Sequence, residues 1–158
     1  MDSRNYPEGL GANKSRYISG TLVSFGEAKT LRARVTLAQL NAGFTLLPAL
    51  VGVRWRLLGA MLIAVGGAAT TGTSVNLIGT VAAAAVQLVV VTVAALTQST
   101  PIAIGTVAPA AGAVTLLADG ASFTQQDANT AITVKTVGAA MTVLTNLDVQ
   151  LEYAADPA

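Results

Sequence analysis

The chain has 158 residues, of which 53 % are hydrophobic, 4 % aromatic and 11 % charged, and its formal net charge is +1. This length fits one domain with a full hydrophobic core, but an average soluble domain carries about 25 % charged residues. The low charge indicates a protein that lies in lipid or hides much of its surface against other protein. The absence of cysteine and histidine excludes disulfides, thiol nucleophiles, and the commonest general base and transition-metal ligand.

The charged residues are divided unevenly along the chain. Residues 1–56 hold eight basic and three acidic residues (+8 − 3 = +5), and residues 57–158 hold one basic and five acidic residues (+1 − 5 = −4). No residue between Leu57 and Ala118 is charged. The chain therefore has a basic first third, a neutral middle and a mildly acidic end.

Residues 1–19 are rich in Gly and Asn and show little apolar periodicity. We expect an extended N-terminal arm that is ordered only by contact with another molecule, or else a frayed terminus. Tyr6 and Tyr17 stand among its charges, and aromatic residues together with arginine favour docking. Because the first residues lack the apolar core of a signal peptide, we expect synthesis in the cytoplasm.

Residues 20–158 are predicted to form one domain, whose first strands are residues 21–25 and 31–37. In the second of these, alternation places Arg32 and Arg34 on the face opposite the apolar side chains. The next element is a single helical turn, which Thr36 is expected to cap and Gly43 to end.

Two further strands are predicted at residues 44–48 and 53–65, the first stopped by its proline. Alternation in the second places Trp55 on the side opposite Arg54 and Arg56, which indicates a core position for the only tryptophan.

Residues 77–96 are uncharged and long enough to cross a bilayer as a helix. However, nine of these twenty residues are β-branched, and no Lys, Arg, Trp or Tyr lies within ten residues on either side. β-Branched residues favour a sheet, and membrane helices are flanked by basic and aromatic anchors. We therefore predict two buried strands, residues 76–80 and 86–96, separated by a turn or bulge at the four alanines 82–85.

Short strands are also predicted at residues 102–108, 113–118, 131–136 and 147–153. The last has the clearest alternation, with its acidic residues on the outer face. Eight to ten short strands between Gly-, Pro- and Thr-rich turns predict an all-β fold of the sandwich or barrel kind. The pattern leaves open whether the strands pair up-and-down or as a jelly roll.

Few residues suggest catalytic chemistry. The oxygen-bearing side chains of Asp119, Asp127 and Asn129 could hold calcium, but turn chemistry explains this pattern as well. Asp148 and Glu152 are expected to point outward, which makes them poor candidates for glycoside hydrolysis. The Gly-rich residues 66–74 lack the lysine of a phosphate-binding loop. We expect no enzymatic activity, no cofactor and no metal.

Basic and aromatic residues of the first third are the remaining candidates for a binding site. A low net charge and few aromatics argue against nucleic acid, so an acidic protein surface is the expected partner. The alternative is a solvated strand face. The predicted binding residues are Arg4, Tyr6, Lys14, Arg16, Tyr17, Lys29, Arg32 and Arg34.

Residues 35–153 resemble small virion proteins of tailed bacteriophages, of the head decoration or capsid cement family. The resemblance rests on "TLAQLNAG…LLPA", "RWRLLGAMLIAVGG", "LADGASFT…DANTAI" and the closing amphipathic strand. It implies a β-sandwich or jelly-roll-like protein that forms homotrimers on the outer capsid surface, with an N-terminal arm reaching neighbouring subunits. The uncharged middle agrees with this expectation, since the centres of protein interfaces are depleted of charge.

The sequence thus predicts an all-β, β-sandwich or jelly-roll-like domain with an extended N-terminal arm, which decorates and stabilises a phage capsid. The expected partners are the major capsid protein and two further copies of the chain, without nucleic acid, membrane or small-molecule substrate. The alternatives are a fibre or host-surface adhesin component and a small membrane protein.

Overall fold

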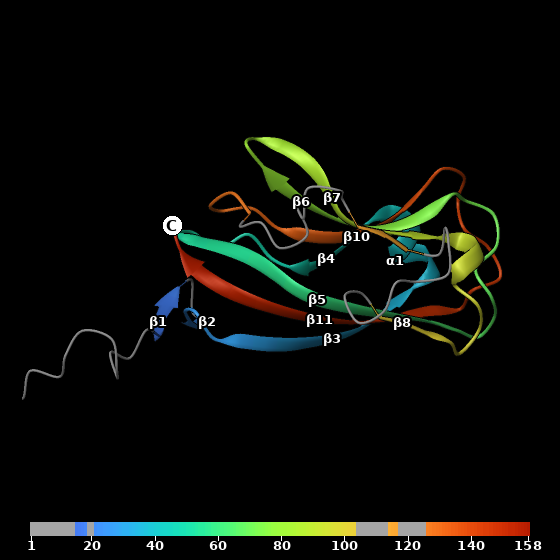
Figure 1. Ribbon diagram of the computed structural model, residues 1–158, viewed down its shortest axis with the longest axis horizontal. Coiled ribbons are helices and arrows are strands. Elements are labelled where there is room, and N and C mark those ends of the chain that lie inside the picture. Colours follow the sequence, from blue (N-terminus) through green and yellow to red (C-terminus); the bar gives the residue numbers. More distant parts are fainter. Residues whose placement is uncertain (1–14, 19–20, 104–113, 117–125) are drawn as a thin grey trace, which may run out of the picture.

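The computed structural model of the protein describes residues 15–18, 21–103, 114–116 and 126–158. It confirms the all-β sandwich: a five-stranded and a four-stranded antiparallel sheet pack face to face, with a separate two-stranded hairpin (Figure 1). The elements of the described part are β1 (Ser15–Ile18), β2 (Thr21–Ser24), β3 (Ala28–Thr36), α1 (Leu37–Ala42), β4 (Phe44–Leu47), β5 (Val53–Val65), β6 (Ser74–Val81), β7 (Ala84–Thr92), the 3-10 turn η1 (Val93–Ala95), β8 (Pro101–Ala103), β9 (Val114–Leu116), β10 (Ile132–Val137) and β11 (Asn146–Pro157).

The strand order decides between the two pairing schemes that the sequence leaves open. The four-stranded sheet has the order β3-β11-β5-β8, and the five-stranded sheet has the order β4-β10-β6-β7-β9. Apart from the added edge strand β9, the eight strands from β3 to β11 pair first with last: β3 with β11, β4 with β10, β5 with β8 and β6 with β7. This nested pairing is the winding of a jelly roll.

Most of the uncharged residues 77–96 fold as predicted into a hairpin, β6 and β7, rather than into one helix. The second strand differs from the prediction of residues 86–96: it begins at Ala84 and ends at Thr92, and Val93–Ala95 form the 3-10 turn η1. The turn between the two strands consists of Ala82 and Ala83, with φ angles of 52° and 60°. Such left-handed angles are unfavourable for alanine, but Asp127 holds the turn: its two carboxylate oxygens accept the N–H groups of Ala82 and Ala83 at 3.1 and 2.7 Å. Among the described residues, no helix has the length and hydropathy needed to cross a membrane.

The predicted helical turn is also confirmed. The Thr36 hydroxyl accepts the Gln39 N–H at 3.3 Å, and the Gln39 side chain accepts the Thr36 N–H at 2.9 Å, which forms a capping box. Gly43 ends the helix with a φ of 98°, where any other residue would be strained. This helix leads the chain from β3 in one sheet to β4 in the other.

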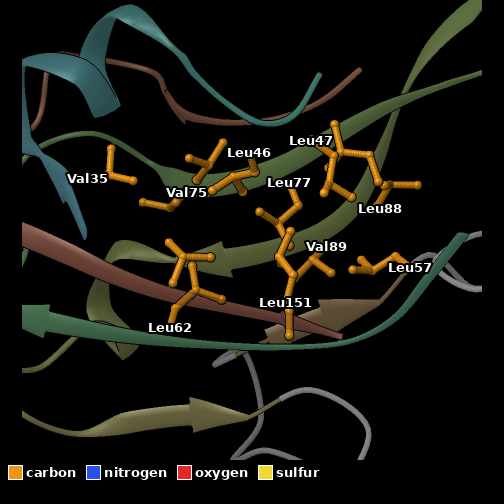
Figure 2. Close-up of a cluster of buried hydrophobic side chains, with 14 of the residues drawn as sticks. Val35, Leu46, Leu47, Leu57, Leu62, Val75, Leu77, Leu88, Val89 and Leu151 are labelled. Carbon is orange, nitrogen blue, oxygen red and sulfur yellow. The ribbon is translucent and has the colours of Figure 1, made fainter. Parts of the chain in front are cut away.

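The core lies between the two sheets, and both contribute aliphatic side chains to it. Figure 2 shows Val35, Leu57, Leu62 and Leu151 of the four-stranded sheet facing Leu77 and its neighbours on the five-stranded sheet. Each fully buried side chain of this size stabilises the fold by about 1.5–3 kcal/mol.

Trp55 is 4 % exposed, which confirms its predicted place in the core. Its Nε1–H donates to the Pro48 carbonyl at 2.9 Å. The Tyr153 ring packs edge-on against it, with the ring centroids 5.7 Å apart. The tryptophan therefore joins β5, β11 and the turn after β4.

The β1–β2 hairpin lies at the end of the sandwich where the chain terminates (Figure 1). Phe25, directly after β2, forms a parallel bridge with Ala155 near the end of β11. Residues 15–18 of the predicted arm are thus paired with β2, and residues 1–14 lie outside the described residues. The arm boundary at residue 19 stays a prediction.

Candidate functional site

The predicted binding residues fall into two groups. Arg4, Tyr6 and Lys14 lie outside the described residues, and Arg16 and Tyr17 are positions of β1. The structure gives the positions of the three predicted residues of β3, which are Lys29, Arg32 and Arg34.

These three residues do not share one face of β3. Arg32 and Arg34 are exposed on the outer face of the four-stranded sheet. Lys29 has the same parity as Leu31 and Val35, whose side chains face the opposite sheet. The predicted patch is thus reduced to the two arginines.

Arg34 is paired with a carboxylate on the neighbouring strand. Its Nε and Nη2 donate to the two oxygens of Asp148 at 2.6 and 2.7 Å, across the register pair of β3 and β11. The hydrogen bond and charge of Arg34 hold the pKa of the Asp148 carboxyl below its ordinary value, and Asp148 in turn raises the pKa of Arg34. With side-chain exposures of 62 % and 33 %, the pair adds little to stability, because water screens it.

Arg32, in contrast, forms no ion pair with the described residues. Its Nε donates to the amide oxygen of Gln150 at 2.9 Å, and no carboxylate of the described residues lies within ion-pair distance of it. A guanidinium has five N–H groups, so four of them remain to bind another molecule.

The two arginines border a hollow on the outer face of the four-stranded sheet. It has a volume of about 430 Å³ and crosses β3, β11 and β5. The side chains of Met61 and Ile63 form its apolar side, and those of Arg32, Arg34, Asp148 and Gln150 form its polar side. We call this site the outer hollow. Its half-buried apolar side chains and the remaining N–H groups of Arg32 suit a protein ligand that is partly apolar and partly acidic.

The alternation of residues 147–153 predicts an outer face for their acidic side chains, but it does not predict their pairing with the arginines. One pattern in the sequence could have indicated this pairing. Arg32 and Arg34 alternate with apolar residues in the first long strand, and Asp148 and Gln150 alternate with apolar residues in the last. Only the jelly-roll winding makes these two strands neighbours.

The outer face of the five-stranded sheet has a different character. Lys135 is the only charged residue among its strands β4, β10, β6, β7 and β9. The four-stranded sheet has eight: Lys29, Arg32, Arg34, Arg54, Arg56, Asp148, Glu152 and Asp156. Ile78 and Val90 of the outer five-stranded face are half-buried.

Asp127 and Asn129, two residues of the possible calcium site, have structural roles in turns. Asp127 accepts the turn N–H groups of the β6–β7 hairpin, and the Asn129 side chain accepts the Gly52 N–H at 2.7 Å. Asp119 lies outside the described residues. Within the described part, no three acidic side chains come together as a metal site.

Comparison with known proteins identifies no relative: no family model, curated protein or solved structure matches this chain. Its site and function must therefore be inferred from its own residues and geometry.

Proposed function

We propose that this protein is a structural component of a tailed-phage virion, which binds the outer surface of the capsid as a homotrimer and stabilises the shell. The observation that carries the proposal is the nearly uncharged outer face of the five-stranded sheet. A strand set with one charged residue suits contact with other protein better than exposure to water.

The five-stranded face is the surface proposed for contact between copies. Ile78 and Thr133 lie opposite each other on β6 and β10, and Val90 is opposite Asn76 on β7 and β6. This face joins Thr, Val and Ile side chains to polar Asn76 and Gln87 and to one charged residue, Lys135. Its low charge suits an obligate interface, whose centre is depleted of charge. In a cyclic trimer, this face of each copy would lie in a contact with a sister copy.

The outer hollow is the surface proposed to bind the major capsid protein. It lies on the opposite side of the sandwich from the five-stranded face, so one copy can contact its sister subunits and the shell at the same time. Binding only to the assembled shell stabilises that shell by mass action, which requires complementary surfaces and no reactive group.

The jelly-roll winding supports this proposal only as an analogy, because the same architecture serves viral capsids, lectins and cupins. The fibre or adhesin alternative calls for exposed aromatic side chains that stack on sugars. Two of the few aromatics, Trp55 and Tyr153, instead pack against each other. The observations therefore favour the capsid proposal.

The direct test uses heads of the encoding phage from which the decoration has been stripped. We expect the purified protein to co-sediment with these heads and to raise the temperature at which they release their DNA. Ile63→Lys should abolish co-sedimentation because it places a charge in the apolar side of the outer hollow. Full binding by this variant, or no binding by the wild type, would contradict the proposal.

The predicted arm is tested separately by deleting residues 1–14, which leaves β1 in place to pair with β2. We expect the shortened protein to keep its fold and to bind heads more weakly. Equal binding by the full and the shortened chains would exclude a docking role for Arg4, Tyr6 and Lys14.

A further inference from the structure

The edge of β3 that faces away from β11 is a second surface that could bind a partner. β3 is an edge strand that pairs only with β11 in its sheet. In an antiparallel pair, about half of a strand's backbone groups point away from the neighbour. Along the nine residues of β3, the described part of the chain provides no backbone partner for these groups, so β3 can accept one more strand.

The two sides of this edge differ in chemistry. On the outer side, the exposed guanidinium groups of Arg32 and Arg34 are two positions apart, or about 7 Å along the strand. On the inner side, Leu31 and Ala33 pack against the core but are only half-buried, whereas Leu151 on β11 is fully buried. The edge thus offers cations on one side and incompletely covered apolar surface on the other.

We propose that the β3 edge binds an extended segment of a partner protein in which acidic and apolar residues alternate. Such a segment would add as a fifth strand, with its carboxylates beside the guanidinium groups and its apolar side chains over Leu31 and Ala33. The inference does not rest on the capsid proposal, because it depends on this strand alone.

The protein already contains one strand that matches β3 in this way. On its other side, β3 pairs with β11, where Asp148 and Gln150 meet the arginines and Leu147, Val149 and Leu151 are buried. A second strand in which acidic and apolar residues alternate would lie beside the same two guanidinium groups. Each of these groups has N–H groups that do not bond to β11.

A second copy of β3 is a poorer occupant of the edge. Antiparallel pairing of two β3 strands would bring Arg32 and Arg34 of one copy close to the same arginines of the other. Like charges on neighbouring strands are destabilising. Charge complementarity therefore selects an acidic partner.

The probe for this proposal is a fluorescently labelled peptide with the sequence of residues 146–153, NLDVQLEY. We expect the full-length protein to bind it in fluorescence anisotropy, and a peptide with lysine in place of both acidic residues to bind at least about tenfold more weakly. Equal binding of the two peptides would overturn the proposal.

Arg32→Gln is the informative protein variant, since Arg32 is exposed and lies outside the ion pair of Arg34. It should weaken peptide binding by about tenfold. Arg54→Gln, which removes an exposed charge from β5 instead, should leave binding unchanged. If Arg32→Gln binds as well as the wild type, the edge does not recognise acidic groups.

Strand addition itself is tested by N-methylation of alternate peptide residues. Methyl groups on the N–H groups that face β3 should abolish binding, and methyl groups on the intervening residues should have little effect. Binding of both methylated peptides would exclude strand addition. Dimerisation that occupies the β3 edge and blocks the peptide would show that a second copy is the occupant and would likewise overturn the proposal.

Discussion

The two sheets share one hydrophobic core but present opposite outer faces. The strands of the four-stranded sheet carry eight charged residues, and those of the five-stranded sheet carry one, Lys135. Among the strands, the charged residues therefore lie almost entirely on one of the two sheets. This difference indicates that the two faces meet different surroundings.

The winding of the chain produces this separation. The uncharged residues 57–118 supply three of the five strands of one sheet, β6, β7 and β9. They also supply most of β5 and all of β8 in the other sheet, but there the basic β3 and the acidic β11 lie side by side. Because a jelly roll pairs its first strand with its last, the excess positive charge near one end of the sequence meets the excess negative charge near the other.

The largest effect is expected from placing one charge on the outer face of either sheet. Ile78 and Ile63 are half-buried isoleucines on central strands, on the outer faces of the five-stranded and four-stranded sheets. Ile78→Lys should convert the proposed trimer to monomers, a threefold loss of mass in sedimentation velocity, while Ile63→Lys should leave the trimer intact. The near-ultraviolet circular dichroism of Trp55 controls for folding. Trimers of the Ile78→Lys variant, or monomers of both variants, would contradict the assignment of the faces.

Charge reversal at the outer hollow has the next largest expected effect. Arg32→Glu should reduce binding to stripped heads, with a greater loss at low salt than at high salt, because salt screens exposed charges. Head co-sedimentation at two salt concentrations measures this effect, with Arg54→Glu as the control. An equal loss at both concentrations would point to misfolding instead.

Asp127 stabilises the five-stranded sheet, because its carboxylate accepts the two turn N–H groups of the β6–β7 hairpin. Asp127→Ala should lower the free energy of unfolding by about 1–3 kcal/mol, since two turn N–H groups lose their acceptors. Asp127→Asn retains one carbonyl acceptor and should lose less. Denaturant titration followed by Trp55 fluorescence gives both values, and an unchanged midpoint for Asp127→Ala would show that the turn does not need its cap.

In the same hairpin, replacing Ala83 by glycine should stabilise the fold. Ala83 has a φ of 60°, so Ala83→Gly should relieve strain and raise the free energy of unfolding by up to about 1 kcal/mol. Ala85→Gly, in the adjoining strand β7, should lower it by about 0.5–1 kcal/mol. Loss of stability in both variants would be inconsistent with a strained turn.

The smallest effect is expected on the charged sheet, in the pH dependence of stability. Folding lowers the pKa of Asp148, so its contribution is present above the pKa of the unfolded chain and is lost as the pH falls through the lower folded value. Asp148→Asn should therefore make the acid side of the stability curve slightly flatter. An unchanged acid slope would show that the Arg34 pair does not contribute.

Local features of the fold were predictable from the sequence. The β-branched content of residues 77–96, the capping role of Thr36 and the core position of Trp55 all follow from short-range chemistry, and the structure confirms them. The identity of the two outer arginines also follows from alternation alone.

Long-range pairing was not predictable in the same way. The Arg34–Asp148 pair joins residues 114 positions apart, and no local pattern states that the first long strand lies beside the last. The β6–β7 turn uses two alanines where Asn-Gly would be usual, because a distant carboxylate, Asp127, supplies the stabilisation. Proximity in sequence suggests one patch of Lys29, Arg32 and Arg34, but the alternation along β3 assigns Lys29 to the opposite face.

The mass of the wild-type protein in detergent-free buffer is the most direct test of the central claim, that sister copies cover the nearly uncharged face of the five-stranded sheet. Light scattering on a gel-filtration column should give three chains of 15.9 kDa, or 3 × 15.9 = 47.7 kDa. A mass of 15.9 kDa at all loading concentrations would contradict the account, because the five-stranded face would then be exposed to water.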